Sequence, residues 1–188
     1  MERREAVQYI GLLLGGTLVG ANAFITGCKT ADKKDNTVFS QEDVAYLDEV
    51  ADTILPTTST PGAKAAKVGQ FMTVMVNDCY EPKDQKVFHE GLTKLNDAAK
   101  KQFDGDFIKL NPQQRHDLLV KLDGEQKDYT NKKKPEDPAH YFRMMKELTL
   151  LGYFTSEIGS KQARRYVAVP GRYEGCIPYK KGDKAWAT

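Results

Sequence analysis

Apolar residues recur at three- and four-residue intervals in five separate stretches of the chain, each bounded by proline, glycine or charged residues. This spacing matches the α-helix, in which side chains three and four positions apart share one face. We therefore expect an all-α fold, a small bundle of about five amphipathic helices that pack their apolar faces together. The faces comprise Val44, Leu47, Val50, Ala51 and Ile54; Val68, Phe71, Met72, Met75 and Val76; Val87, Phe88, Leu92, Leu95, Ala99 and Phe103; Leu118, Leu119 and Leu122; and Tyr141, Phe142, Met145, Leu148, Leu151 and Phe154.

Local signals predict where the first three helices begin and end. Ser40 followed by Asp43 predicts a capping box at the start of the first helix, and Pro56 ends it. The second helix is expected over residues 63–80 and the third over residues 84–103. The segment between the first two helices is rich in proline, threonine and glycine, which predicts a loop.

Two further helices are expected in the second half of the chain. Asn111 before Pro112 predicts the N-cap of the fourth helix, and the charged residues 123–138 are expected to form a linker. The fifth helix is expected over residues 139–158. Gly152 within it indicates either a close approach of another segment or simply a cost of about 1 kcal/mol in helix propensity.

The helical periodicity is lost from Gln162 onward, and an irregular tail rich in proline, glycine and tyrosine follows. Such a segment must pack on the helices or on something else, because it has little capacity to form a core of its own. Arginine and tyrosine are typical of interface hot spots. Two interpretations stay open, a partner interface and a strap whose tyrosines cover helix faces. The candidate interface residues are Arg165, Tyr166, Pro170, Arg172, Tyr173 and Tyr179.

The N-terminus has the features of an export signal. Arg3 and Arg4 precede an uncharged stretch whose apolar run covers residues 9–25. A basic segment followed by a short apolar one is typical of a signal peptide. The alternative is a permanent transmembrane helix, but a run of about 17 residues is at the lower limit of the length needed to span a membrane. Arg3 and Arg4 are also candidates for a twin-arginine export signal, although an ordinary basic segment explains them equally well.

The apolar run ends in a sequence that resembles the bacterial lipobox, Ile25-Thr26-Gly27-Cys28. That resemblance implies that Cys28 is acylated and becomes the new N-terminus, and several acyl chains anchor a protein to a membrane durably. We therefore expect a lipoprotein-type signal peptide at residues 1–27, a flexible tether at residues 28–39 and a helical domain at residues 40–188.

No catalytic or cofactor-binding motif is found in the sequence. Glycine-rich nucleotide loops, a nucleophile elbow and a haem-attachment motif are absent, and His89, His116 and His140 lie on separate expected helices without the spacing of metal ligands. We expect no catalytic residue, cofactor or metal in this chain. The net charge of +2 among 188 residues also excludes a strongly basic nucleic-acid binder.

Two cysteines remain once Cys28 is assigned to the lipid. An exported protein enters an oxidising compartment, so Cys79 and Cys176 are candidates for a disulfide that ties the tail to the second helix. Two free thiols, or a bridge to a partner chain, are the alternatives.

Five stretches of the sequence resemble the gluconate 2-dehydrogenase subunit 3 family, the small subunits of membrane-bound, flavin-dependent sugar and polyol dehydrogenases. They lie at residues 47–57, 60–63, 107–114, 142–155 and 173–176. They include Leu55-Pro56-Thr57, Thr60-Pro61-Gly62-Ala63, Leu148-Thr149, Gly152-Tyr153-Phe154-Thr155 and Tyr173-x-Gly175-Cys176.

The resemblance implies a non-catalytic accessory subunit. In this family a large subunit of the glucose-methanol-choline type holds FAD and oxidises the sugar, and a cytochrome c subunit with haem c usually takes the electrons onward. The small subunit assists export and assembly of the large one. We therefore expect this chain on the periplasmic side of a bacterial membrane, docked to a flavoprotein and anchored by lipid, with no nucleic acid as partner. The alternative is a stand-alone lipoprotein that binds saccharide or another protein through exposed aromatic residues.

Overall fold

The structure is a computed structural model that describes residues 38–169 and 171–187. In these residues the secondary structure is helical, as predicted, apart from one isolated β-bridge between Arg165 and Trp186. The α-helices are α2 (Gln41–Ile54), α3 (Val68–Cys79), α4 (Pro82–Phe103), α5 (Pro112–Lys132) and α6 (Tyr141–Thr155), with short turns η1 (Phe107–Lys109) and η2 (Gly159–Ala163).

The predicted export signal, with Arg3, Arg4 and Cys28, lies outside the described residues. Most of the predicted tether also lies outside them. Its last residue, Phe39, stacks on the ring of His89 with the ring centroids 4.1 Å apart and meets Phe88 edge-on at 5.9 Å. Phe39 therefore packs against α4.

Side chains cap the helices where the sequence predicts. Ser40 accepts a hydrogen bond from the backbone of Asp43, whose carboxylate accepts one from the backbone of Ser40 in return, which completes a capping box. Asn111 and Gln114 form the same reciprocal pair at the start of α5. These caps satisfy backbone donors that the first helical turn leaves without partners.

Two predicted boundaries are wrong. Helix α3 begins at Val68 rather than near residue 63, because Lys67 adopts a left-handed conformation (φ 54°) that a continuous helix does not allow. Residues 123–132, expected as part of a linker, extend α5 instead. Here Gln126 is buried in place of an apolar residue, and Asp123 pairs with Lys127 one turn on at 2.8 Å.

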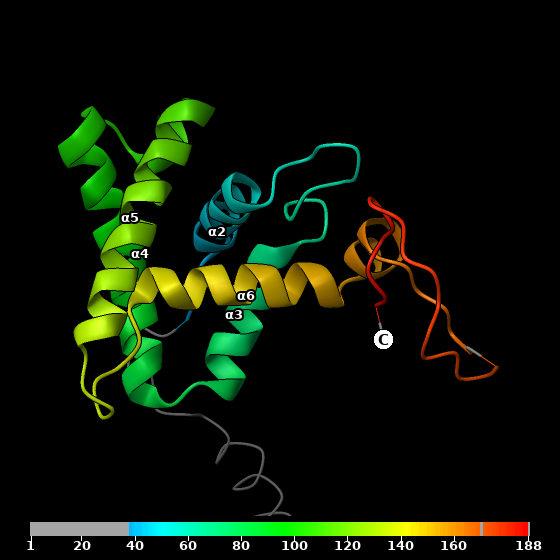
Figure 1. The fold of residues 1–188 in the computed structure, drawn as a ribbon. Helices are drawn as coiled ribbons and strands as arrows, with labels where there is room; N and C mark the ends of the chain where they lie inside the picture. The colour runs from blue at the N-terminus through cyan, green and yellow to red at the C-terminus, as the bar shows by residue number, and fades with distance from the viewer. Residues whose placement is uncertain (1–37, 170, 188) are drawn as a thin grey trace, which may run out of the picture. The chain divides into compact units, whose positions relative to one another are not determined.

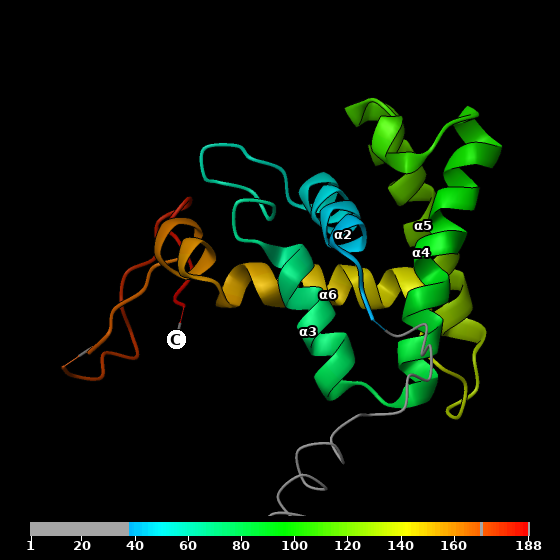
Figure 2. The same ribbon diagram turned by 180° about the vertical axis from the view of Figure 1, so that it is seen from behind.

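Helix α6 is the centre of the packing and contacts each of α2, α3, α4 and α5. Figures 1 and 2 show α4 and α5 running side by side, with α6 crossing α3. The core contains most of the residues expected from their spacing, but Leu151 was predicted wrongly, since 46% of it is exposed. Fully or almost fully buried are Leu47, Val50, Ala51, Val68, Met72, Val76, Phe88, Leu95, Ala99, Phe107, Leu118, Phe142, Met145 and Thr149.

The crossing of α3 and α6 depends on Gly152. A Cβ atom at this position would come within 2.6 Å of the Phe71 ring, closer than van der Waals contact allows. Of the two explanations offered by the sequence, the close approach is therefore confirmed. The glycine lets the aromatic ring of one helix lie directly on the backbone of the other.

Candidate partner-binding surface

The aromatic residues of the C-terminal tail do not cover the helices. Tyr173 is 96% exposed and Tyr179 is 77% exposed, while Tyr166 is 44% exposed. Arg165 and Arg172 are exposed as well, and Pro170 lies outside the described residues. The tail therefore presents rings and guanidinium groups to the solvent, where a partner can reach them.

The two ends of the tail are held together. The backbone of Arg165 donates to the carbonyl of Ala185 (2.8 Å), and the backbone of Ala187 donates to the carbonyl of Arg165 (3.0 Å). The Arg165 guanidinium lies 3.7 Å above the ring of Trp186, a cation–π contact, and Arg164 donates to the Trp186 carbonyl (2.7 Å). We call residues 165–186 the C-terminal loop and the Arg165–Trp186 contact its clasp.

The loop runs away from the helices and returns, as Figures 1 and 2 show. In its outer part the hydroxyl end of Tyr173 lies close to Gly175, where a Cβ atom would be 2.7 Å from the hydroxyl oxygen and 3.0 Å from the ring. The Tyr173 side chain is nevertheless almost fully exposed. Arg172 and Glu174 form an ion pair at 2.6 Å beside it.

The loop also carries a net positive charge. With the flanking residues 164 and 187 it contains six basic and two acidic residues, whereas the whole chain has a net charge of only +2. The remainder of the chain is therefore net negative. The basic residues are Arg164, Arg165, Arg172, Lys180, Lys181 and Lys184.

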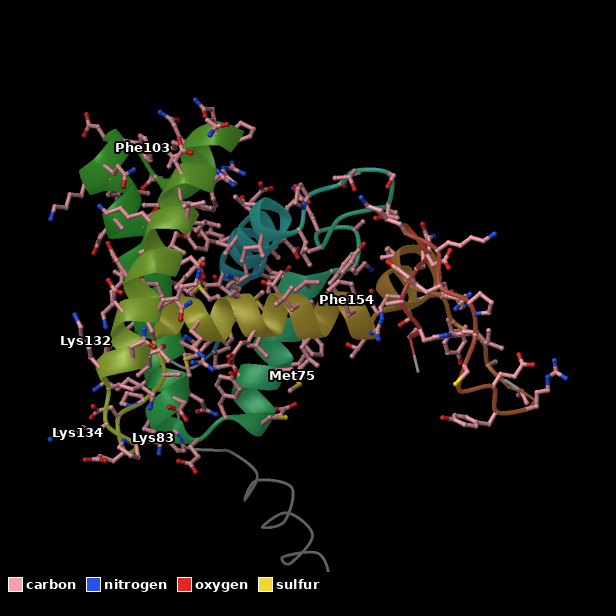
Figure 3. The ribbon with its side chains drawn as sticks, in the orientation of Figure 1. Met75, Lys83, Phe103, Lys132, Lys134 and Phe154 are labelled. Atoms are coloured by element: carbon pink, nitrogen blue, oxygen red, sulfur yellow. The ribbon has the colours of Figure 1, made fainter. Side chains whose placement is uncertain are left out.

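The loop over residues 56–62 is attached to the end of α6. Tyr153 donates from its hydroxyl to the carbonyl of Pro61 at 2.7 Å. The neighbouring Phe154, labelled in Figure 3, lies under the guanidinium of Arg164, whose carbon is 5.7 Å from the ring centroid. Consecutive residues of α6 thus hold the 56–62 loop and the base of the C-terminal loop.

The described cysteines and histidines do not gather into a metal site. Cys79 and Cys176 are exposed free thiols in this structure, and their pairing stays a prediction. His116 is exposed beside Asp117 at 3.5 Å. His140 accepts a hydrogen bond from the backbone of Phe142 at the start of α6, and burial lowers its pKa. Among the described residues no group of three or more His, Cys, Asp or Glu side chains is placed to hold a metal.

A hollow lies between α2, α4 and η1. Its polar lining includes Asp97 and Asp106, and the lysines Lys100 and Lys109 pair with Asp106 at 3.4 and 3.1 Å. Hydrogen bonds from Asn96 and from these lysines lower the pKa of Asp106 to about 2, so the carboxylate stays ionised at neutral pH. This arrangement fits a structural ion cluster that joins η1 to α4, because Asn96 and Lys100 of α4 contact Asp106, the residue before η1, and Lys109 of η1 pairs with the same carboxylate.

Sequence reasoning missed three residues that hold these surfaces in place. Arg164 and Trp186 were noted only as part of the tail, and Tyr153 only as part of a helix and of a stretch that resembles the family. Their partners lie far along the chain, at 22 residues for Arg164 and Trp186 and at 92 for Tyr153 and Pro61. A local sequence pattern does not predict contacts between residues so far apart in the chain.

A sequence model of gluconate 2-dehydrogenase subunit 3 matches residues 41–171, which is more than half of the chain. The chain belongs to this family. No curated protein and no solved structure matches it closely enough to count as similar. The match begins at the first residue of α2 and ends within the C-terminal loop, so it includes all five described α-helices.

Membership in the subunit 3 family makes this chain an accessory subunit of a dehydrogenase complex. Two stretches that carry the family resemblance in the sequence meet in the fold, since Tyr153 bonds to Pro61. No helix in the described part of the chain is both long and apolar enough to cross a membrane.

Proposed function

We propose that this protein is the non-catalytic small subunit of a periplasmic, FAD-dependent sugar or polyol dehydrogenase of the glucose-methanol-choline type. It docks to the flavoprotein large subunit and assists its export, assembly and attachment to the membrane. FAD belongs to the large subunit and haem c to a cytochrome subunit, while this chain contributes neither cofactor nor catalytic residue. The observation that supports docking is the exposure of Tyr173 and Tyr179 on a loop that is held in shape.

The physical argument is the cost of exposed aromatic rings. A monomer gains nothing from holding large rings in water, whereas an interface gains from burying them. Tyrosine and arginine are the residue types that contribute most binding energy at protein interfaces, and the C-terminal loop contains both. The family supplies the class of partner.

Membrane attachment is proposed to reside in Cys28 and export in Arg3 and Arg4. Replacement by Cys28→Ser removes the thiol to which lipid is attached, so the protein is expected to move from the membrane fraction to the soluble periplasm. Replacement of Arg3 and Arg4 by lysine keeps the basic charge, and is expected to block export only if the twin-arginine route is used.

The deciding experiment is purification of the tagged, natively expressed protein, followed by an absorbance spectrum of the eluate. A larger chain that co-elutes with the absorption bands of bound flavin supports the proposed function. A colourless preparation with no second chain contradicts it. The exposed rings of Tyr173, Tyr179 and Trp186 would then favour a stand-alone lipoprotein that binds saccharide, which equilibrium dialysis with labelled sugars tests.

A further inference from the structure

The C-terminal loop has the features of a docking element that is formed before its partner arrives. Two backbone hydrogen bonds, the cation–π clasp and the bond from Arg164 to the Trp186 carbonyl all close its base. Lys184 adds a hydrogen bond to the carbonyl of Gln162. A loop closed in this way loses less conformational freedom on binding than an open tail, so more of the contact energy appears as affinity.

The loop places one ring farthest into the solvent. Tyr173 is almost fully exposed, and the hydroxyl end of its ring lies close to the backbone at Gly175. An aromatic ring that stands out from its surroundings is suited to enter a recess on another protein. Arg172 and Glu174 flank the ring and neutralise each other, so the entering group itself is close to uncharged.

The charge of the loop indicates what surrounds that recess. Lys180, Lys181 and Lys184 follow the ring along the chain, and Arg164 and Arg165 stand at the base. Opposite charges on two surfaces accelerate their encounter and fix their orientation. We therefore expect acidic residues around the recess.

A membrane surface fits the loop less well than a protein does. The loop is irregular, and backbone amide and carbonyl groups that enter hydrocarbon without partners cost several kcal/mol each, whereas a protein recess supplies partners. Glu174 and Asp183 lie among the basic residues and would be repelled by anionic lipid. The Arg172–Glu174 ion pair beside the Tyr173 ring, and the carboxylate of Asp183, are better suited to a folded protein that supplies hydrogen-bond partners.

We propose that the C-terminal loop is a preformed docking element, that Tyr173 enters an acid-rimmed recess on the flavoprotein large subunit, and that the Arg165–Trp186 clasp positions it. This inference rests on the proposed function, since it takes the large subunit as the partner. Tyr173 contacts the partner directly. Trp186 and Arg165 act through the loop.

The test measures the affinity of the purified full-length subunit for the separated large subunit at low and high salt. Tyr173→Ala is expected to weaken binding by about 30-fold, the loss typical of an anchoring aromatic residue. Reversing both Lys180 and Lys181 to glutamate is expected to slow association by about 10-fold at low salt, with the difference shrinking as salt is added. The matched control reverses Lys132 and Lys134, exposed lysines near the end of α5 that Figure 3 places far from the loop, and is expected to change neither value.

The clasp has a readout of its own, because Trp186 is the only tryptophan in the chain. In the free subunit, Arg165→Ala is expected to shift the tryptophan emission and to speed proteolysis within residues 166–185. The same variant is expected to weaken binding, and Arg165→Lys, which keeps a cation over the ring, to restore part of the affinity.

The possible results separate this inference from the proposed function. If the wild-type subunit recovers no flavoprotein, the proposed function fails and the inference fails with it. If the wild type binds the flavoprotein and Tyr173→Ala and the lysine reversals bind equally well, only the docking inference is overturned. It is also overturned if those variants keep their flavoprotein but lose binding to vesicles of phosphatidylglycerol, since the loop would then be a lipid-binding element.

Discussion

Tyr153 on α6 donates its hydroxyl hydrogen to the carbonyl oxygen of Pro61, 92 residues earlier in the chain, at 2.7 Å. The Tyr153 ring itself is buried in the core, and its neighbour Phe154 meets it edge-on with the centroids 5.2 Å apart. One residue therefore joins the core to the loop over residues 56–62. The Tyr153 hydroxyl is thus one of the contacts that fix the position of that loop.

Tyr153→Phe is expected to destabilise the protein by about 1 kcal/mol, because the Pro61 carbonyl loses its donor while the ring remains in place. The free energy of unfolding in urea measures the loss. Hydrogen exchange is expected to show faster exchange at the amides of Gly62 and Ala63, whose own bonds to Thr57 and Leu55 fix the loop. Tyr166→Phe on the exposed tail is the control, and an equal loss there would contradict this role of Tyr153.

Gly152→Ala is expected to destabilise the protein by about 1–3 kcal/mol, because the added methyl group overlaps the Phe71 ring and forces α3 and α6 apart. Gly124 on α5 is the matched control, since a Cβ atom there meets nothing within 4 Å. Gly124→Ala is expected to stabilise the protein by up to about 1 kcal/mol through helix propensity alone. Equal effects at both positions in thermal unfolding would show that the crossing is not tightly packed.

The starts of the helices illustrate what the sequence predicts and what it does not. Helix starts were predictable at Ser40 and Asn111 because the capping side chain lies three residues from the group it satisfies. The start of α3 was not, because the backbone of Gly69 donates to Asp48 on a different helix at 2.8 Å. Burial raises the pKa of Asp48, which no spacing in the sequence indicates.

The second half of α5 was missed for a related reason. The apolar stripe ends at Leu122, and the buried position one turn later is taken by Gln126, which donates to Asp123 at 3.1 Å. A rule based on apolar periodicity cannot find a helix whose inner face becomes polar. For the candidate interface, composition left open whether the rings are exposed or cover the helices, and the clasp between Arg165 and Trp186 joins positions too far apart for any local pattern.

Arg115→Lys is expected to destabilise the protein by about 1–3 kcal/mol even though it keeps the charge. Arg115 on α5 pairs with Glu49 on α2, and its planar group also donates to the carbonyls of Phe107 (3.1 Å) and Ile108. A lysine amine cannot reach all three. The Arg115 side chain is only 16% exposed, so water can hardly replace it as the hydrogen-bond donor to these carbonyls.

The control for Arg115 is Arg143→Lys on α6. Arg143 makes a surface ion pair with Glu147 at 2.7 Å, and its side chain is 41% exposed. Exposed ion pairs contribute little to stability, so Arg143→Lys is expected to change the free energy of unfolding by no more than about 0.5 kcal/mol. If both substitutions have the same effect on the urea midpoint, the planar geometry of the Arg115 guanidinium does not contribute to the stability of the protein.

Asp123 is expected to make the stability of the protein depend on pH. It accepts hydrogen bonds from Lys127 (2.8 Å), one turn along α5, and from Lys146 on α6 (2.6 Å). These bonds lower its pKa from 3.8 to about 2. A carboxylate whose pKa is depressed by folding stabilises the native state above its unfolded pKa, and that stabilisation is lost as the pH falls from 3.8 toward 2.

Asp123→Asn is therefore expected to cost about 1 kcal/mol at neutral pH, a value discounted for the solvent that still reaches the carboxylate. The difference from wild type should shrink as the pH falls toward 2, where wild-type Asp123 is itself half protonated. Asp128→Asn, an equal loss of charge at an exposed site on the same helix, controls for net charge. Urea unfolding at a series of pH values measures all three proteins. A constant difference across the acid range would mean that Asp123 acts through its shape and hydrogen bonds, and that its charge does not link α5 to α6.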